Sequence, residues 1–229
     1  MNLSLELDHL VVVVKDLEKA TSIFRDNGFY VSPGGTHGLT INALILFEEG
    51  PYIELIAMKN NLLRKTFKIL HFFRFLKVFE FFAPSLTHRF INWFAQSNGI
   101  RDICFSDTNL KHNIFSESKS KEALLPKKKF YRETLSGEKA EWYLTGYQMH
   151  SLPFFIEDIT NKEIRVPIDT SDTNKINTGF ISKVTVNDKG LTLFNNSIIE
   201  YKTHQDDRIK IQLSGNNALN LEKALKKIT

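Results

Sequence analysis

The chain has 229 residues, of which 42% are hydrophobic and 24% charged, a balance typical of water-soluble globular domains. This length suits one large domain or two small ones. The formal net charge is +4, but acidic and basic residues are interspersed along most of the chain, so we expect no nucleic-acid partner. The single cysteine, Cys104, excludes an internal disulfide, and no apolar signal segment begins the sequence. We therefore expect a cytoplasmic protein.

Motifs that indicate several common enzyme classes are absent. The sequence has no GxGxxG or GxxxxGK(S/T) loop for nucleotides, no HExxH zinc motif and no GxSxG nucleophile motif. Nucleotide-dependent enzymes and serine hydrolases are therefore not serious alternatives.

The first 58 residues predict the order strand, helix, strand, strand, strand. The apolar, β-branched run Leu7–Val14 predicts a buried strand, and Asp16 is a suitable N-cap for a helix that ends at Asn27-Gly28. Pro33–Gly35 is expected to be a turn or an open loop. The other three strands are expected at 29–31, 41–47 and 52–58.

Several short motifs follow one another along this region. They are Leu7-Asp8-His9-Leu10, Asp16-Leu17, Asn27-Gly28-Phe29, Gly34-Gly35-Thr36-His37, Asn42-Ala43 and Tyr52-Ile53-Glu54-Leu55. Together they resemble the glyoxalase-like branch of the vicinal-oxygen-chelate superfamily. The resemblance implies an α+β fold in which paired βαβββ modules form a curved mixed sheet around a cup for a small-molecule ligand.

The resemblance also implies a divalent metal ion, such as Zn²⁺, Ni²⁺, Mn²⁺ or Fe²⁺, in the cup. Metal-dependent members place a histidine on the first strand and a glutamate on the fourth, and those positions match His9 and Glu54. A carboxylate inside an apolar strand is costly to bury unless it is paired or bound to metal. A Glu54 that is hydrogen-bonded to backbone at the edge of the cup is an evenly weighted alternative.

A second module is expected over 98–168, and it would supply the other half of the site. Its final strand, Pro153–Glu157, repeats the pattern of Tyr52-Ile53-Glu54, so internal symmetry and the resemblance make Glu157 the expected third ligand.

The first strand of this second module lacks a histidine to match His9. Depending on register, the equivalent residue is Arg101, Asp102 or a neighbour. Asp102 would suit a metal ligand, whereas Arg101 would bind an anionic substrate and would argue against metal.

Other side chains are candidates for substrate contact or proton transfer. His37 lies in the glycine-rich segment and is a candidate general base or additional ligand; an exposed loop histidine is the plain alternative. Asn42 is a candidate substrate contact. Trp142 and Tyr147 would line the pocket, although core packing is the commoner role of such residues.

The expected domain boundaries are 1–60 for the first module, 61–97 for a helical insertion, 98–168 for the second module and 169–229 for a C-terminal β-rich extension. Within the insertion, Leu62–Phe82 is expected to form one helix with a wide apolar face and a narrow basic stripe. It would be a lid or wall over the cup, a dimerisation helix, or a helix lying on an anionic membrane surface. A further helix is expected at 86–95.

Two classes of function remain. In the first, the chain is a divalent-metal enzyme of the lyase, isomerase or dioxygenase type. His9, Glu54 and Glu157 would hold the ion, and His37 or a carboxylate would move a proton on a small, partly hydrophobic, oxygen-bearing molecule. In the second class, the same cup binds such a molecule without turnover, as sequestering, resistance-type proteins do. The two glutamates favour the enzyme and the missing fourth ligand favours the binding protein; we favour the enzyme.

Overall fold

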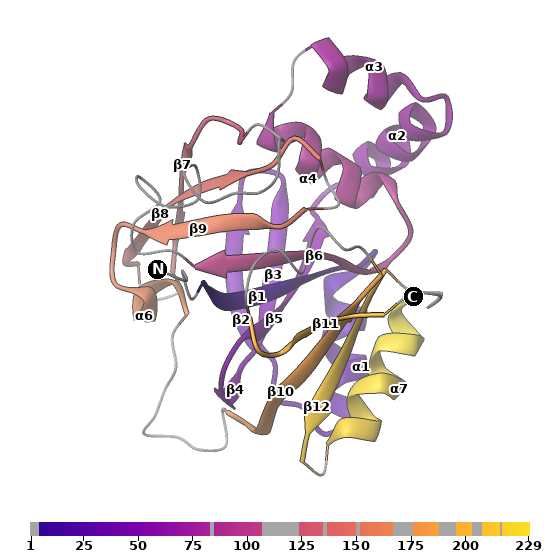
Figure 1. Ribbon diagram of the computed structural model, residues 1–229. Coiled ribbons are helices and arrows are strands. Elements are labelled where there is room, and N and C mark those ends of the chain that lie inside the picture. The colour runs from indigo at the N-terminus through magenta and orange to yellow at the C-terminus, as the bar shows by residue number, and fades with distance from the viewer. Residues whose placement is uncertain are drawn as a thin grey trace.

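A curved sheet of eight strands forms the centre of the molecule (Figure 1). The computed structural model describes residues 5–82, 85–106, 124–134, 137–149, 152–166, 176–187, 196–202, 208–215 and 217–229. In spatial order the strands are β2 (Ser32–His37), β3 (Thr40–Ile45), β5 (Tyr52–Met58), β1 (Glu6–Val13), β6 (Gly99–Ser106), β9 (Phe154–Asp158), β8 (Lys139–Gly146) and β7 (Lys128–Glu133).

The sheet consists of two halves with the same strand order. In each half the first strand pairs in parallel with the fourth (β1 with β5, β6 with β9), and β1 pairs antiparallel with β6 at the centre. The two outer strands meet on the far side, where His37 Nδ1 donates to the Tyr131 carbonyl at 2.6 Å. The sheet is therefore almost closed, and the predicted α+β fold with paired modules around a cup is confirmed.

Strand β1 is buried from Leu7 to Val13, and its residues from Leu10 onward are all apolar, because both of its faces are covered. Leu10 and Val12 pack into the core beneath the sheet, and Val11 and Val13 pack into a second cluster inside the cup. Helix α1 (Leu17–Asp26) covers the outer face with Phe24, and the Asp16 carboxylate caps it by accepting from the Lys19 amide.

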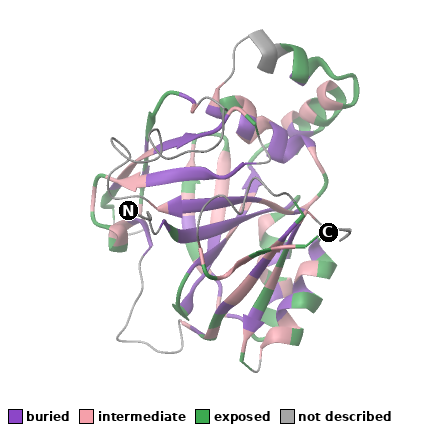
Figure 2. Cartoon of the chain, viewed as in Figure 1, coloured by how far each residue is buried: buried purple, intermediate pink, exposed green. Residues whose placement is uncertain are grey.

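A second, smaller sheet packs against the outer face of the first module (Figure 1). Its strands are β10 (Asn177–Val186), β11 (Ile199–Tyr201), β12 (Ile209–Ser214) and β4 (Phe47–Glu49), and helix α7 (Ala218–Ile228) lies beside them. The buried Asn177 side chain bonds to the backbone of Tyr30 and Leu46 and so attaches this extension to the first module. In Figure 2 the central strands β1 and β6 are coloured mostly as buried, whereas buried and exposed residues are mixed in β10, β12 and α7.

The insertion between the modules forms three helices, α2 (Asn61–Phe72), α3 (Phe75–Phe82) and α4 (Leu86–Ala95). The single helix expected over 62–82 is wrong in one respect. The chain breaks at Arg74, which adopts a left-handed φ of 61°, so α2 and α3 form a short hairpin that stands out from the body (Figure 1). A small helix, α6 (Lys162–Arg165), follows β9.

The turn or loop expected at Pro33–Gly35 is also wrong, because these residues belong to strand β2. A Cβ at Gly34 would collide with the Asn42 side chain on β3. Because glycine has no side chain, β2 can pair closely with β3 at this position. The sequence of the second module also predicts part of a helix at 110–115, and these residues lie outside the described ones.

Candidate functional site

A cavity of about 350 Å³ lies inside the cup, between the sheet and helices α2 and α4. Its walls are predominantly apolar and aromatic, with Phe67 from α2 and Phe90 from α4 on the helical side. The polar residues that border it are His9, His37, Thr40, Asn42, Tyr52, Glu54, Thr87, Arg132 and Arg165. An apolar pocket with a few converging polar groups is the usual form of a small-molecule site.

His9 on β1 is a titratable group at this cavity that is held by contacts on several sides. Its Nδ1 lies 2.6 Å from Asp8 Oδ1, and its Nε2 lies 3.5 Å from Glu54 Oε2. The ring stacks on Tyr52, with centroids 4.9 Å apart, and meets the edge of Phe154. Because the ionised Asp8 carboxylate can only accept a hydrogen bond, Nδ1 is the donor, and in this tautomer of the neutral ring Nε2 faces the cavity unprotonated.

Asp8 stays ionised because a buried arginine faces it. Arg165 Nη1 and Nη2 donate to both Asp8 oxygens at 3.1 and 3.0 Å, and Nη1 also donates to the Tyr52 hydroxyl at 2.6 Å. Burial alone would raise the pKa of Asp8, but the Arg165 charge and the His9 hydrogen bond outweigh it and hold that pKa well below its usual range. Asp8 therefore fixes the tautomer and orientation of His9.

Glu54 on β5 is held from its other side by a polar chain. Asn42 Nδ2 donates to Glu54 Oε1, and Arg132 Nη1 donates to Asn42 Oδ1 at 3.2 Å. Arg132 is 5% exposed and also donates to the Arg165 carbonyl, and its Nε has no acceptor among the described residues. A charged guanidinium thus borders the cavity with spare hydrogen-bonding capacity.

The strand register identifies the residues of the second module that correspond to His9 and Glu54. On the paired strands β1 and β6, His9 lies opposite Cys104 and Val11 lies opposite Asp102. The approximate two-fold relation between the modules therefore places Asp102 at the position that corresponds to His9. The partner of Val11 on β5 is Glu54, and the partner of Cys104 on β9 is Phe154. The second half of the cup therefore offers Asp102 and an apolar ring at these positions.

Asp102 is already bound by helix α4. Arg89 Nε and Nη2 each donate to this carboxylate at 2.7 Å, and Trp93 Nε1 donates to it at 2.8 Å. Arg89 is fully buried and also donates to the carbonyls of Tyr147 and Leu152. The insertion thus fills the second half of the cup with an ion pair, and the cavity belongs mainly to the first half.

A divalent ion of the kind that the fold family implies finds only part of a site here. Asp8, His9 and Cys104 form a buried group whose donor atoms lie within 4.8 Å of one another. Both oxygens of Asp8, however, already accept from Arg165, and burial raises the pKa of the Cys104 thiol well above its usual range. A dication would lie beside a guanidinium and would need a thiolate that this site disfavours. Of the four module positions, only His9 and Glu54 remain available, so the described residues do not fit a resident ion.

Several residues predicted for the site do border the cavity. His9, His37, Asn42, Glu54 and Trp142 all contribute to its wall. His37 is also tied to β7 through its Nδ1, so it joins the two edges of the sheet as well as facing the cavity.

The structure places the other predicted site residues elsewhere. Glu157 lies three residues past Phe154, the equivalent of Glu54, on the opposite face of β9, where it pairs with Lys127. Tyr147 is buried on that same outer side, against Phe155. Arg101 donates to the backbone of the turn between α4 and β6. The expected three-ligand set is therefore not assembled.

Sequence reasoning missed the arginines of the site. Arg89, Arg132 and Arg165 are each at most 5% exposed, which is unusual for arginine without a partner. Arg132 and Arg165 come from segments that read as ordinary surface, since strand β7 and the short helix α6 are both rich in charge. A local signal existed only for Arg89, which lies amid the apolar residues of α4.

Comparison with known proteins supports the fold and the family. Over 93% of this chain and 92% of the other, the structure is similar to that of a hypothetical protein from Staphylococcus aureus, with 18% identity and a TM-score of 0.64. A methylmalonyl-CoA epimerase from Streptomyces coelicolor, in complex with 2-nitronate-propionyl-CoA, shows 12% identity and a TM-score of 0.42 over 68% of this chain and 98% of its own. A methylmalonyl-CoA epimerase in complex with methylmalonyl-CoA and NH4+ shows 12% identity and a TM-score of 0.43 over 69% of this chain and 97% of its own. A search of curated proteins found no match. A family model described as a glyoxalase-like domain matches residues 7–188, and the chain therefore belongs to the glyoxalase-like family.

Proposed function

We propose that the protein binds a small, largely apolar carbonyl compound in the cup and moves a proton on it, as an isomerase or a lyase, without a metal ion. The observation that carries this proposal is the array Asp8–His9–Glu54, which opens onto an apolar cavity. The metal dependence expected from the sequence is not retained, because Arg89 and Phe154 take up the second half of the cup.

His9 is the proposed general base. Its Nε2 takes a proton from the carbon next to the substrate carbonyl, and the imidazolium that results lies between two carboxylates, Asp8 and Glu54. Asp8 keeps its charge throughout because of Arg165. General-base catalysis of this kind contributes about 10²–10⁴-fold to the rate, and Glu54 would help return the proton.

Arg132 is the proposed oxyanion partner. Proton removal creates negative charge on the carbonyl oxygen, and the Arg132 guanidinium, which borders the cavity and whose Nε has no acceptor among the described residues, would stabilise that charge. The aromatic wall around it suits an aryl or branched alkyl body.

A second candidate is sequestration of the same kind of molecule without turnover. It is favoured by the apolar character of most of the cavity wall, from Phe67 to Phe90 and Trp142.

The test combines binding and proton exchange. Both tryptophans of the chain, Trp93 and Trp142, line the cavity, so quenching of intrinsic fluorescence reports binding directly. Apolar 2-oxo acids and aryl ketones would be screened this way. Those that bind would be incubated in D₂O while ¹H NMR follows the loss of the proton next to the carbonyl.

We expect exchange that falls by about 10²-fold or more in His9→Gln, with binding retained. Arg25→Met, on the exposed side of α1, is the matched control and should exchange as the wild type does. A compound that binds tightly yet exchanges no proton faster than in buffer would refute the enzyme and favour sequestration.

A further inference from the structure

Helix α2 is apolar on two opposite sides. Its inner side, with Leu63 and Phe67, packs against the cluster inside the cup. Its outer side exposes Leu62, Ile69 and Phe72, which are 71%, 57% and 80% exposed. These three residues lie on one side of the helix and form an apolar stripe, interrupted by Lys65 and Thr66 between Leu62 and Ile69, that nothing in the described chain covers.

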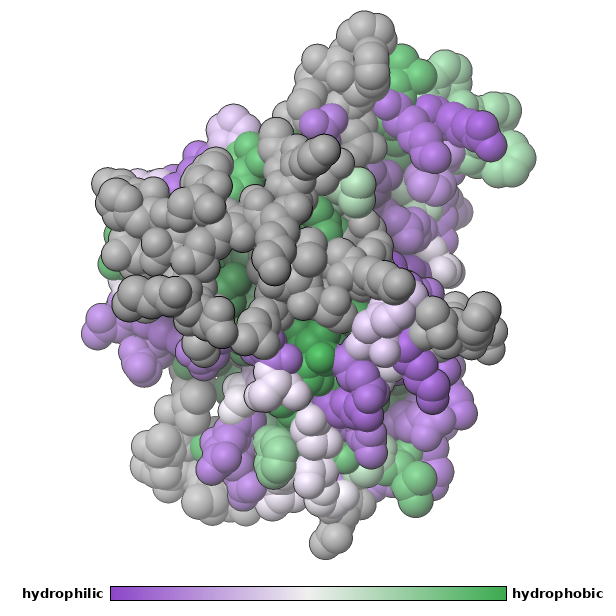
Figure 3. Space-filling model, in the orientation of Figure 1, coloured by the Kyte–Doolittle hydropathy of each residue, from purple (hydrophilic) through white to green (hydrophobic). Residues whose placement is uncertain are grey.

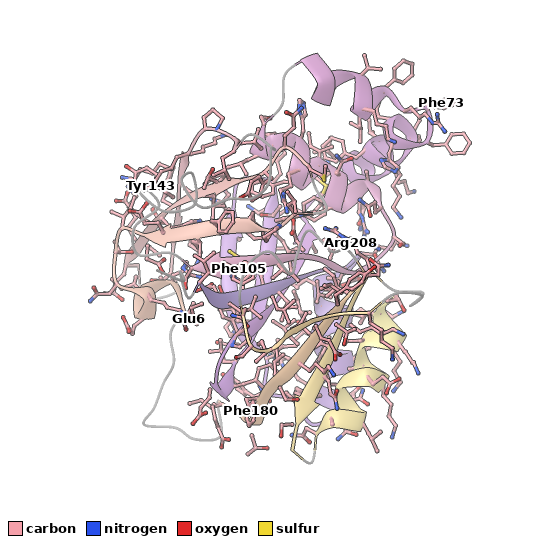
Figure 4. All side chains as sticks on the ribbon, in the orientation of Figure 1. Glu6, Phe73, Phe105, Tyr143, Phe180 and Arg208 are labelled. Atoms are coloured by element: carbon pink, nitrogen blue, oxygen red, sulfur yellow. The ribbon has the colours of Figure 1, made fainter. Side chains whose placement is uncertain are left out.

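The apolar stripe continues across the break into α3. Phe73, Phe75 and Val78 are all more than half exposed, and the left-handed Arg74 between them turns the chain so that both helices contribute to one tip. Figure 4 shows Phe73 pointing away from the body of the protein, and Figure 3 shows apolar surface at this end of the molecule. Single exposed apolar residues are ordinary, but a contiguous set of this kind marks an interaction surface.

The same hairpin is strongly cationic. Residues 61–78 contain no acidic residue, and Lys65, Lys68, Arg74 and Lys77 are all exposed. Burial lowers the pKa of Lys68, and the nearby positive charges of Arg64, Lys15 and Arg101 lower it further. The cations at the base of the hairpin therefore repel one another, and the one acidic residue in the sequence of the hairpin is Glu80, near the end of α3.

We propose that the α2–α3 hairpin docks on an anionic lipid bilayer. Exposed phenylalanines would enter the interface while the lysines contact lipid phosphates, which is how interfacial amphipathic helices bind membranes. A second copy of the chain fits this surface less well, because a symmetric contact would set its cations against the same cations. No helix among the described residues is long and apolar enough to cross a bilayer.

Docking would also place the cavity close to the lipid. Phe67 on α2 and Phe90 on α4 both line the cavity, and α2 carries the exposed stripe on its other side. An apolar ligand dissolved in the membrane would then have a short route to the cup. The docking itself does not depend on what the cup does with that ligand.

The test is co-sedimentation of the full chain with vesicles. One set contains phosphatidylcholine alone and the other equal parts of phosphatidylcholine and phosphatidylglycerol. We expect binding to the anionic vesicles only, weakened by added salt. Phe72→Ser/Phe73→Ser and Lys65→Glu/Lys68→Glu should each weaken it by more than about tenfold. Leu219→Ser removes an equally exposed apolar side chain on α7 and should bind as the wild type does.

Other outcomes would overturn the proposal. They are equal binding to both kinds of vesicle, no binding to either, and equal loss of binding in Leu219→Ser. A dimer in size-exclusion chromatography that Phe72→Ser/Phe73→Ser converts to monomer would assign the surface to a second copy. All of the substituted side chains are exposed, so the variants should retain the wild-type circular dichroism spectrum, which would be recorded first.

Discussion

Arg89→Met should destabilise the protein strongly, because it would leave Asp102 charged and buried. The wild-type carboxylate receives two hydrogen bonds of 2.7 Å from Arg89 and lies in a site that is about 1% exposed. Breaking a buried ion pair from one side costs about 3–5 kcal/mol. The remaining donors, Trp93 Nε1 and the Ile103 amide, are already used and cannot replace the lost charge. We therefore expect a loss near the upper half of that range.

The free energy of unfolding would be measured by urea denaturation followed by tryptophan fluorescence. The slope of this free energy against urea concentration would be compared between variants. Arg89→Met/Asp102→Leu removes both charges and should recover most of the loss, because apolar pairs of similar volume replace buried ion pairs at little cost. Arg25→Met, which removes an exposed arginine, is the control and should change stability by less than about 1 kcal/mol. A loss below about 1 kcal/mol for Arg89→Met, or a double variant no more stable than the single one, would refute the reasoning.

Three further predictions concern the rest of the fold. Asp8 has a depressed pKa in the folded state, so its contribution to stability is present above the unfolded pKa of about 3.9 and is lost as the pH falls from there toward the folded value. In Asp8→Asn, the free energy of unfolding measured by urea denaturation should depend less on pH below about 4 than in the wild type. An unchanged dependence of this free energy on pH would contradict the ion pair with Arg165. Gly179→Ala should lower the melting temperature, because φ there is +92° and a Cβ would collide with the Ser214 carbonyl on β12; an unaltered melting temperature would show that β10 and β12 can separate freely. Cys104 is fully buried with a raised pKa, so an aromatic disulfide reagent should label it only after denaturation, and rapid labelling of the native protein would be the contrary result.

The sequence predicted the role of a residue best where that role depends only on the strand to which the residue belongs. The apolar run of β1 and the motifs around His9 and Glu54 predicted the paired modules and two residues of the cavity wall, since both lie on strands covered on both faces. The C-terminal extension was likewise predicted to be β-rich, and it forms β10 to β12 with helix α7. The cytoplasmic location stays a prediction.

Prediction failed where the role depends on register between distant strands. Glu157 matches Glu54 as a local pattern, but pairing with β6 puts Phe154 at the equivalent position, and an odd shift in a strand reverses the face of a side chain. Arg165 becomes a site residue only because the chain brings it against Asp8, 157 residues away in the sequence. No local pattern encodes such a contact.

The most direct test of the central claim is proton exchange by metal-stripped protein. A compound that the cup binds would be followed by ¹H NMR in D₂O after exhaustive dialysis of the protein against EDTA, with elemental analysis of the same sample. We predict that exchange continues at the rate of the undialysed protein and that Glu54→Gln slows it. Exchange that disappears with the metal and returns with added Zn²⁺, Ni²⁺, Mn²⁺ or Fe²⁺ would contradict the account and restore His9 and Glu54 as metal ligands.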